Sequence, residues 1–172
     1  ALLAAMDSMT IREKVGQIMM VPLYSKPGEP ESAEEVQAAI EQWGIGGVIA
    51  MQGDTATTRY NLTKLDSVAQ KRSGFRLLTA MDAEWGAGMR LPDGITFPKA
   101  MALGATEQED LIRQAGRAAG IELRRLGVGI AFAPVADVNS NPDNPVIGTR
   151  AFGSRPESVG VLPSARPAGL GD

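Results

Sequence analysis

Short apolar runs alternate along the chain with longer amphipathic segments. Apolar runs that fit buried strands occupy residues 17–24, 46–52, 75–81 and 128–138. Amphipathic segments that fit helices lie between them, at residues 31–43, 54–72 and 106–126. Strands that alternate with helices in this way favour a parallel sheet with right-handed crossovers. The pattern therefore predicts an α/β protein built from βα units.

Two predicted helices begin with a capping-box pattern, in which a threonine is followed three residues later by a glutamate. Thr10 with Glu13 predicts a short helix ahead of the first strand, and Thr106 with Glu109 predicts the start of the longest helix. Trp43 closes an amphipathic segment, so we expect its ring in the core.

Composition and charge exclude several classes of function. The 172 residues are 44% hydrophobic with a net charge of −3, so no broad basic field is available for nucleic acid or an anionic membrane. The absence of cysteine and histidine argues against a metal centre and against serine–histidine catalysis. No GxGxxG fingerprint follows the first strand, and no apolar run reaches the roughly 18 residues of a membrane span. We therefore predict no cofactor, no metal, no nucleic-acid partner and no membrane span.

Four motifs occur in a fixed order. They are Met81-Asp82-Ala83-Glu84-Trp85-Gly86 with Arg90 downstream, Phe97-Pro98, the segment 133–139, and the segment 144–153. Together they resemble the N-terminal barrel domain of family 3 glycoside hydrolases, in particular the β-N-acetylglucosaminidase-like branch. The resemblance extends from about residue 8 to residue 159.

This resemblance implies a (β/α)8 TIM-barrel fold. A complete barrel takes about 250 residues, so we expect about the first four βα units, as a half-barrel forming one partial domain over residues 1–172. Pro163 and Pro167 should interrupt a last helix after Pro156, since each proline costs about 3 kcal/mol in a helix interior. We interpret residues 160–172 either as an aberrant or truncated end or as a natural extended tail.

Asp82 follows the third predicted strand, where carboxylates face the active side of a parallel barrel and can accept hydrogen bonds from sugar hydroxyls. The structural alternatives are an N-cap or an ion-pair partner for Arg90. The guanidinium of Arg150 suits vicinal hydroxyls, and the alternative is an ordinary surface arginine. Asp137, after Pro134, could line the pocket or fix a turn.

The resemblance implies that Asp82 and Arg150 hold the sugar of the −1 subsite and that Arg90 lies beside Asp82; Asp137 is a further candidate for substrate binding. It also implies that the catalytic pair lies beyond residue 172. In this branch the nucleophile is an aspartate late in the barrel and the acid/base is a histidine after the fifth strand, and no segment here matches either.

The implied activity is retaining hydrolysis of O-glycosyl bonds in β-linked N-acetylglucosamine or a related β-glycoside, with the 172-residue chain itself inactive. Two alternatives stay open: a non-catalytic sugar-binding half-barrel, and a truncated gene product without function. Trp85 stands where the commoner Asp-x-Glu-Gly-Gly pattern has glycine, which resembles a branch often joined to a serine-hydrolase-like domain. The sequence leaves localisation open.

Overall fold

The computed structural model describes residues 2–165 and divides the chain into two compact units. The first unit comprises Ala1–Met81 with Gly127–Ile130, and the second comprises Asp82–Leu126 with Ala131–Asp172. The β3 strand ends where the second unit begins, so the first unit carries the sheet and the second carries the residues that follow the third strand.

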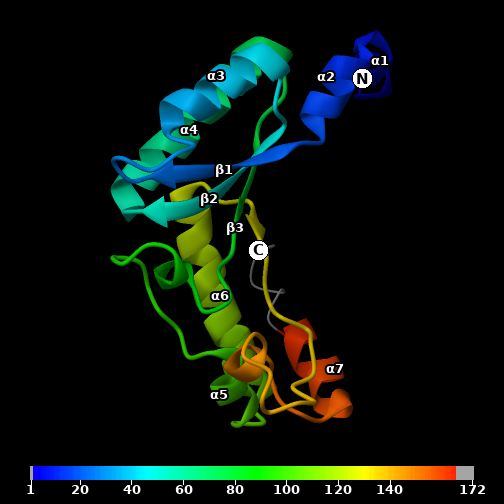
Figure 1. Ribbon diagram of the computed structural model, residues 1–172. Coiled ribbons are helices and arrows are strands. Elements are labelled where there is room, and N and C mark those ends of the chain that lie inside the picture. The colour runs from blue at the N-terminus through cyan, green and yellow to red at the C-terminus, as the bar shows by residue number, and fades with distance from the viewer. Residues whose placement is uncertain (1, 166–172) are drawn as a thin grey trace. The chain divides into compact units, whose positions relative to one another are not determined.

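The first unit is a layer of helices on a parallel sheet. Its elements in chain order are α1 (Leu2–Ser8), α2 (Ile11–Gln17), β1 (Met20–Ser25), α3 (Ala33–Trp43), β2 (Gly47–Gly53), α4 (Thr55–Ser73) and β3 (Leu78–Met81). The strand β2 pairs in parallel with β1 and with β3, and α3 and α4 cover one face of these strands (Figure 1). Leu23, Val48 and Leu65 are fully buried in the core of this layer.

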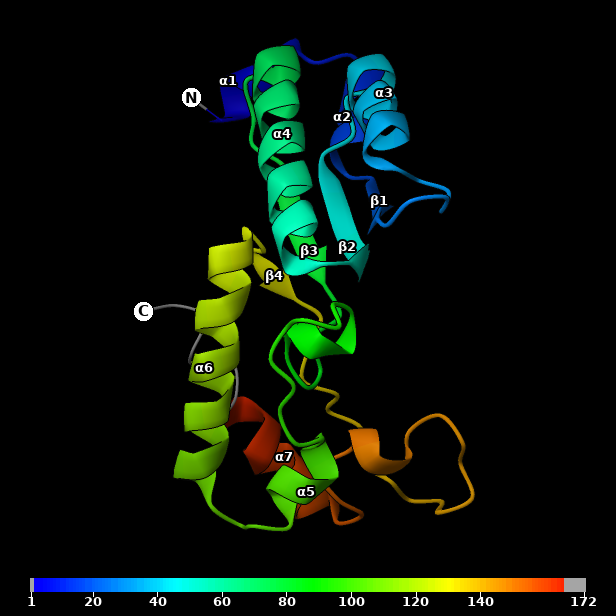
Figure 2. The same ribbon diagram turned by 90° about the vertical axis from the view of Figure 1, so that its left-hand side faces the viewer.

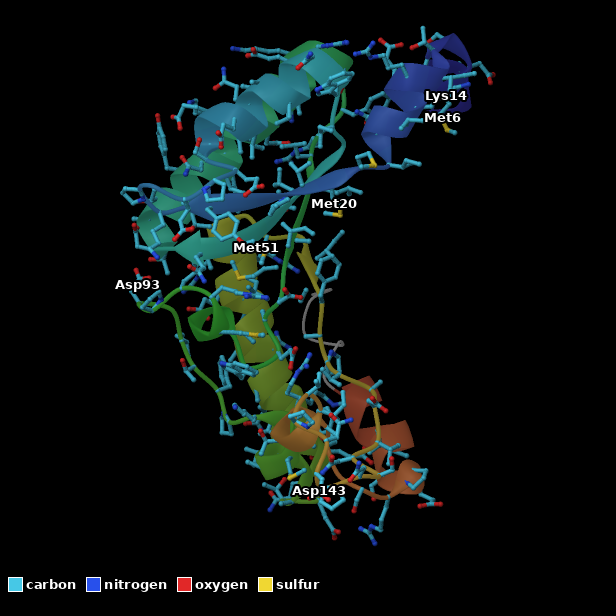
Figure 3. All side chains as sticks on the ribbon, in the orientation of Figure 1. Met6, Lys14, Met20, Met51, Asp93 and Asp143 are labelled. Atoms are coloured by element: carbon cyan, nitrogen blue, oxygen red, sulfur yellow. The ribbon has the colours of Figure 1, made fainter. Side chains whose placement is uncertain are left out.

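No helix of the first unit within residues 2–165 covers the opposite face of the sheet (Figure 1). Met20 and Met51 project from this face and are half-buried (Figure 3). The sheet order is β1-β2-β3-β4, where β4 (Ile130–Ala131) lies at the border of the two units. Helices on one face of a parallel sheet whose strands follow chain order are the arrangement of a (β/α)8 barrel, so the predicted partial barrel is confirmed.

The fourth strand is much shorter than predicted. We expected residues 128–138 to form a strand, whereas β4 comprises only Ile130 and Ala131. Gly129 still donates to the carbonyl oxygen of Thr79 at 3.0 Å. Beyond it, Pro134 has no N–H to give to a ladder, and β3 is the only strand beside β4 within residues 2–165. Without a second neighbouring strand the remaining residues run as a loop.

The second unit is mainly helical. Its elements are η1 (Ala87–Met89), α5 (Ala100–Gly104), α6 (Glu109–Leu126), η2 (Gly148–Arg150) and α7 (Pro156–Ala165), as seen in Figure 2. Its core joins α5, α6, α7 and the residues after η2, through the side chains of Ala100, Leu103, Ile112, Phe152 and Val159. This core holds the segment that carries Arg150.

One of the two predicted capping boxes is confirmed. Thr10 accepts a hydrogen bond from the Glu13 amide while the Glu13 carboxylate accepts one from the Thr10 amide. The prediction for Thr106 is wrong, because α6 begins only at Glu109. The Thr106 hydroxyl instead donates to the carbonyl oxygen of Leu103 in α5 and accepts from the Gln108 amide.

The expected burial of Trp43 is also wrong. Its side chain is 44% exposed. Val36 and Ile40 supply the buried face of α3, and the Arg12 guanidinium lies 4.1 Å from the centre of the Trp43 ring. The ring is therefore covered by a cation at the surface instead of apolar side chains.

The helix α7 continues through Pro163 to Ala165, so the predicted interruption at that residue is wrong. Pro156 is its first residue, a position that favours proline. Val159 is 4% exposed and packs against the core of the second unit, which helps to offset the hydrogen bond that Pro163 cannot donate. Pro167 lies outside the described residues.

Asp54 caps α4 and makes the stability of the first unit depend on pH. A hydrogen bond from the Thr57 amide holds the pKa of the Asp54 carboxyl below its ordinary value. A lowered folded pKa gives stability that is present above the unfolded pKa of about 3.9 and is lost as the pH falls through the folded pKa. We expect Asp54→Asn to lower Tm slightly near neutral pH and the difference to shrink below about pH 4. Thermal melts followed by circular dichroism check this, and a difference independent of pH would contradict it.

Candidate functional site

Asp82 and Arg90 form an ion pair at the start of the second unit. Asp82 follows directly after β3, and its Oδ2 accepts a hydrogen bond from Nη2 of Arg90. The short helix η1 turns the chain back so that Arg90 reaches Asp82, with the Arg90 amide donating to the Ala87 carbonyl oxygen at 2.9 Å. The side chains of Asp82 and Arg90 are 31% and 23% exposed. Arg90 is thus the partner of Asp82, as one of the sequence-based alternatives expected.

The turn between these two residues requires glycine at position 86. Gly86 has a φ of 93°, a conformation that side chains other than glycine rarely adopt. A Cβ at this position would lie 2.5 Å from the carbonyl oxygen of Ile95. The loop that follows Arg90 therefore packs directly on the backbone of the turn and fixes its path.

Arg150 is held by a bidentate ion pair with Glu84. Its Nε lies 2.9 Å from Oε2 of Glu84, and its Nη2 lies 2.7 Å from Oε1. A third hydrogen bond runs from Nη1 to the carbonyl oxygen of Val146 at 3.1 Å. Glu84 is buried, with 9% of its side chain exposed, whereas 35% of the Arg150 side chain is exposed. Arg150 is therefore held by hydrogen bonds to Glu84 and to the Val146 carbonyl oxygen, and its role in sugar binding stays a prediction.

The two ion pairs take their carboxylates from residues 82 and 84 of one segment, and their four residues are called the charged cluster below. The hydrogen bond with Glu84 raises the pKa of Arg150 above its ordinary value; partial burial opposes this, and the charges of Glu84 and Asp82 add to it. The segment directly after β3 supplies both carboxylates of the cluster, whereas Arg150 comes from η2, 66 positions after Glu84.

Asp137 lies outside this cluster. It is exposed, and its Oδ1 accepts a hydrogen bond from the amide of the next residue, Val138, at 2.8 Å. Within residues 2–165 no hydrogen bond or ion pair joins it to Asp82 or Arg150. This geometry favours the turn-fixing alternative, and substrate binding by Asp137 stays a prediction.

The partner of Arg150 was not identified from the sequence. Glu84 entered the sequence analysis only as part of a motif, although it follows Asp82 by two residues. In extended chain, residues two apart point to the same side, so this spacing could have placed Glu84 beside Asp82. The spacing could not have identified Arg150 as the ion-pair partner of Glu84, because Arg150 lies 66 positions downstream.

The second unit also contains an open cavity of about 910 Å³, lined by residues of α5, α7 and the loop around Asn139. None of the four charged residues of the cluster lines it. The described part of the chain has no group of three or more carboxylate, histidine or cysteine residues that could hold a metal ion. No helix between residues 2 and 165 is long and apolar enough to cross a membrane.

Comparison with known proteins agrees with this fold. The model of the glycosyl hydrolase family 3 N-terminal domain matches residues 10–171. Beta-hexosaminidase LpqI of Mycobacterium tuberculosis is 33% identical over 163 residues, which are 94% of this chain and 40% of that protein. Beta-hexosaminidase A of Pseudoalteromonas piscicida is 33% identical over 92% of this chain and 30% of its own length. The structure of a family 3 β-N-acetylglucosaminidase from Paenibacillus sp. FPU-7 has a TM-score of 0.83 at 32% identity, over 95% of this chain and 31% of that one.

The sheet, the helices on one face of it and the charged residues after β3 thus define a protein of the (β/α)8-barrel class. The chain belongs to glycoside hydrolase family 3. It spans 40% and 30% of the length of the two curated relatives named above.

Proposed function

We propose that this chain provides part of the −1 sugar subsite of a retaining β-N-acetylglucosaminidase or related β-glycosidase. The observation that carries the proposal is that two ion pairs, Asp82 with Arg90 and Glu84 with Arg150, take both carboxylates from the segment that follows β3. Among these residues, Asp82 and Arg150 are the two that the family resemblance assigns to the sugar, and Arg90 is the one that it places beside Asp82. The names of the relatives, β-hexosaminidase and β-N-acetylglucosaminidase, support a β-linked amino sugar as the substrate.

The chemistry of the cluster suits a sugar. The carboxylate of Asp82 accepts hydrogen bonds from hydroxyl groups, and the guanidinium of Arg150 donates them. Hydrogen bonds of this kind strengthen as the sugar approaches its oxocarbenium-like transition state, so the cluster would assist hydrolysis as well as binding. Retaining hydrolysis also needs a nucleophilic carboxylate and an acid/base about 5 Å apart, and neither has a counterpart in the motifs of this chain. No cofactor takes part.

The same cluster suits a sugar-binding half-barrel without turnover, which is the second candidate function. A serine-hydrolase-like domain fused to the barrel in the full-length protein is a separate proposal, and it rests on Trp85 in the position of a glycine. The coding sequence downstream of residue 172 would test it.

An activity assay separates the two candidate functions. The 172-residue chain is expected to release no chromophore from 4-nitrophenyl β-N-acetylglucosaminide above background, because it carries neither nucleophile nor proton donor. Fusion of the C-terminal part of a family 3 β-hexosaminidase should restore hydrolysis, since the subsite would again face both groups. A folded fusion that binds the sugar and never hydrolyses it would favour the binding module. Turnover by the 172-residue chain that disappears in Asp82→Ala would contradict the assignment of the catalytic pair.

A further inference from the structure

We infer that Glu84 is a positioning residue, which orients the guanidinium of Arg150 toward the sugar. Its carboxylate also prevents Arg150 from forming an ion pair with Asp82. The inference rests on the proposed function of the cluster and adds a residue whose role the motifs do not assign. Three observations carry it: the bidentate geometry of the pair, the burial of Glu84, and the distribution of charge in the cluster.

The geometry of the pair leaves a defined part of the guanidinium available. Arginine has five N–H donors in a rigid plane. The Nε donor and one Nη2 donor bind Glu84, and one Nη1 donor binds the carbonyl oxygen of Val146. One N–H on Nη1 and one on Nη2 have no partner among the described residues. Because three anchored donors prevent rotation of the plane, the remaining two point in fixed directions.

The burial of Glu84 stabilises this orientation of the Arg150 guanidinium. Its side chain is 9% exposed, so water competes little for its carboxylate, whereas the Arg150 side chain is 35% exposed. Separation of the pair would leave the buried Glu84 carboxylate without a cation, which is energetically unfavourable. The ion pair between Glu84 and Arg150 therefore remains formed. The exposed portion of Arg150 can then meet a ligand without leaving Glu84.

The charges of the cluster are balanced in pairs. Arg90 neutralises Asp82, and Glu84 neutralises Arg150. Without Glu84, Arg150 would lose its carboxylate partner, and the Asp82 carboxylate, which belongs to the same segment two residues earlier, would remain to attract it. A guanidinium drawn to Asp82 would occupy the oxygens that the sugar hydroxyls need. Glu84 thus preserves both the donors of Arg150 and the acceptor of Asp82.

The test measures side-chain rotation and sugar binding on the 172-residue chain. Nitrogen-15 NMR gives the rate of rotation about the Cζ–Nε bond of Arg150, and titration with methyl β-N-acetylglucosaminide gives Kd. We expect Glu84→Gln to speed the rotation and raise Kd about tenfold, equivalent to about 1.4 kcal/mol, and Glu84→Asp to restore part of both. In an Arg150→Ala background, Glu84→Gln should leave Kd unchanged, because Glu84 acts through Arg150.

Glu107→Gln is the matched control. It removes the carboxylate of another glutamate–arginine pair in the second unit, Glu107 with Arg155, which is 76% and 70% exposed. This variant should leave the rotation of Arg150 and Kd unchanged. Circular dichroism establishes that each variant is folded, and Glu84→Asp is the variant to examine if Glu84→Gln does not fold.

The outcomes separate the inference from the proposed function. If the wild-type chain binds the glycoside and a folded Glu84→Gln chain binds it equally well, the positioning role is wrong and the proposed function stands. The positioning role is also wrong if Glu84→Gln weakens binding as much without Arg150 as with it. A wild-type chain that binds no glycoside contradicts the proposed function and the positioning role with it, whatever the rotation rate of Arg150.

Discussion

In a fusion that restores hydrolysis, Asp82→Ala is expected to lower kcat/KM by about 2–4 kcal/mol in transition-state terms, or about 30- to 900-fold. The carboxylate accepts hydrogen bonds that strengthen as positive charge develops on the sugar ring, so the loss should appear mainly in kcat. Steady-state kinetics on 4-nitrophenyl β-N-acetylglucosaminide measure it. Arg150→Ala should cause a loss of the same order if both residues bind one sugar.

Two controls isolate this effect from folding. Asp7→Ala removes an exposed carboxylate in α1 and should leave kcat/KM nearly unchanged. Asp82→Ala also leaves Arg90 without its carboxylate, which can lower stability, so the Tm of each variant must be measured beside its kinetics. If a folded fusion tolerates Asp82→Ala and Arg150→Ala as well as Asp7→Ala, these two residues do not bind the sugar.

Phe152→Ala is expected to lower the free energy of unfolding of the second unit by about 3–5 kcal/mol. The Phe152 side chain is 3% exposed and packs in the core formed by α5, α6 and α7. Its backbone is equally confined, because a Cβ on Gly104 would lie 2.0 Å from the Phe152 carbonyl oxygen. Removal of the ring leaves a cavity that these fixed neighbours cannot fill. Since Phe152 follows Arg150 by two residues, the variant should also loosen the turn that holds the guanidinium.

Urea denaturation followed by circular dichroism measures this loss, and hydrogen exchange of the α6 amides assigns it to the second unit. Phe152→Leu should cost less, because it retains most of the apolar contact. Val146→Ala is the matched surface control, since Val146 is 60% exposed. A Phe152→Ala chain as stable as Val146→Ala would mean that the ring is not part of a packed core.

The sequence predicted those parts of the fold that depend on neighbouring residues. The apolar runs located β1, β2 and β3, and the Thr10 and Glu13 pair located the start of α2. The prediction failed at Thr106. Its hydroxyl donates a hydrogen bond to the carbonyl oxygen of Leu103 in the preceding helix, and it does not cap the start of α6. The prediction failed also at Trp43, whose surroundings depend on Arg12 from a different helix. In both cases a contact from another element outweighed the local pattern.

In the candidate site, too, the sequence predicted the local features and missed the contact between distant segments. The motifs singled out Asp82, Arg90 and Arg150, and the eight-residue spacing allowed the Asp82 and Arg90 pair to be foreseen as one alternative. The pair of Glu84 with Arg150 joins residues 66 positions apart, and nothing in either motif specifies the other as its partner.

Residue order alone determined the family, the βα pattern and the residue types of the site, because hydrophobic periodicity, capping and motifs act over a few positions. The tertiary structure decided which carboxylate neutralises which guanidinium, how far β4 extends, and that within residues 2–165 Asp137 has no hydrogen bond or ion pair with the cluster. Each of these depends on segments brought together by packing and on the cost of burying a charge without a partner. The free-energy cost of burying a charge depends on which groups surround it, and the folded chain alone defines those neighbours.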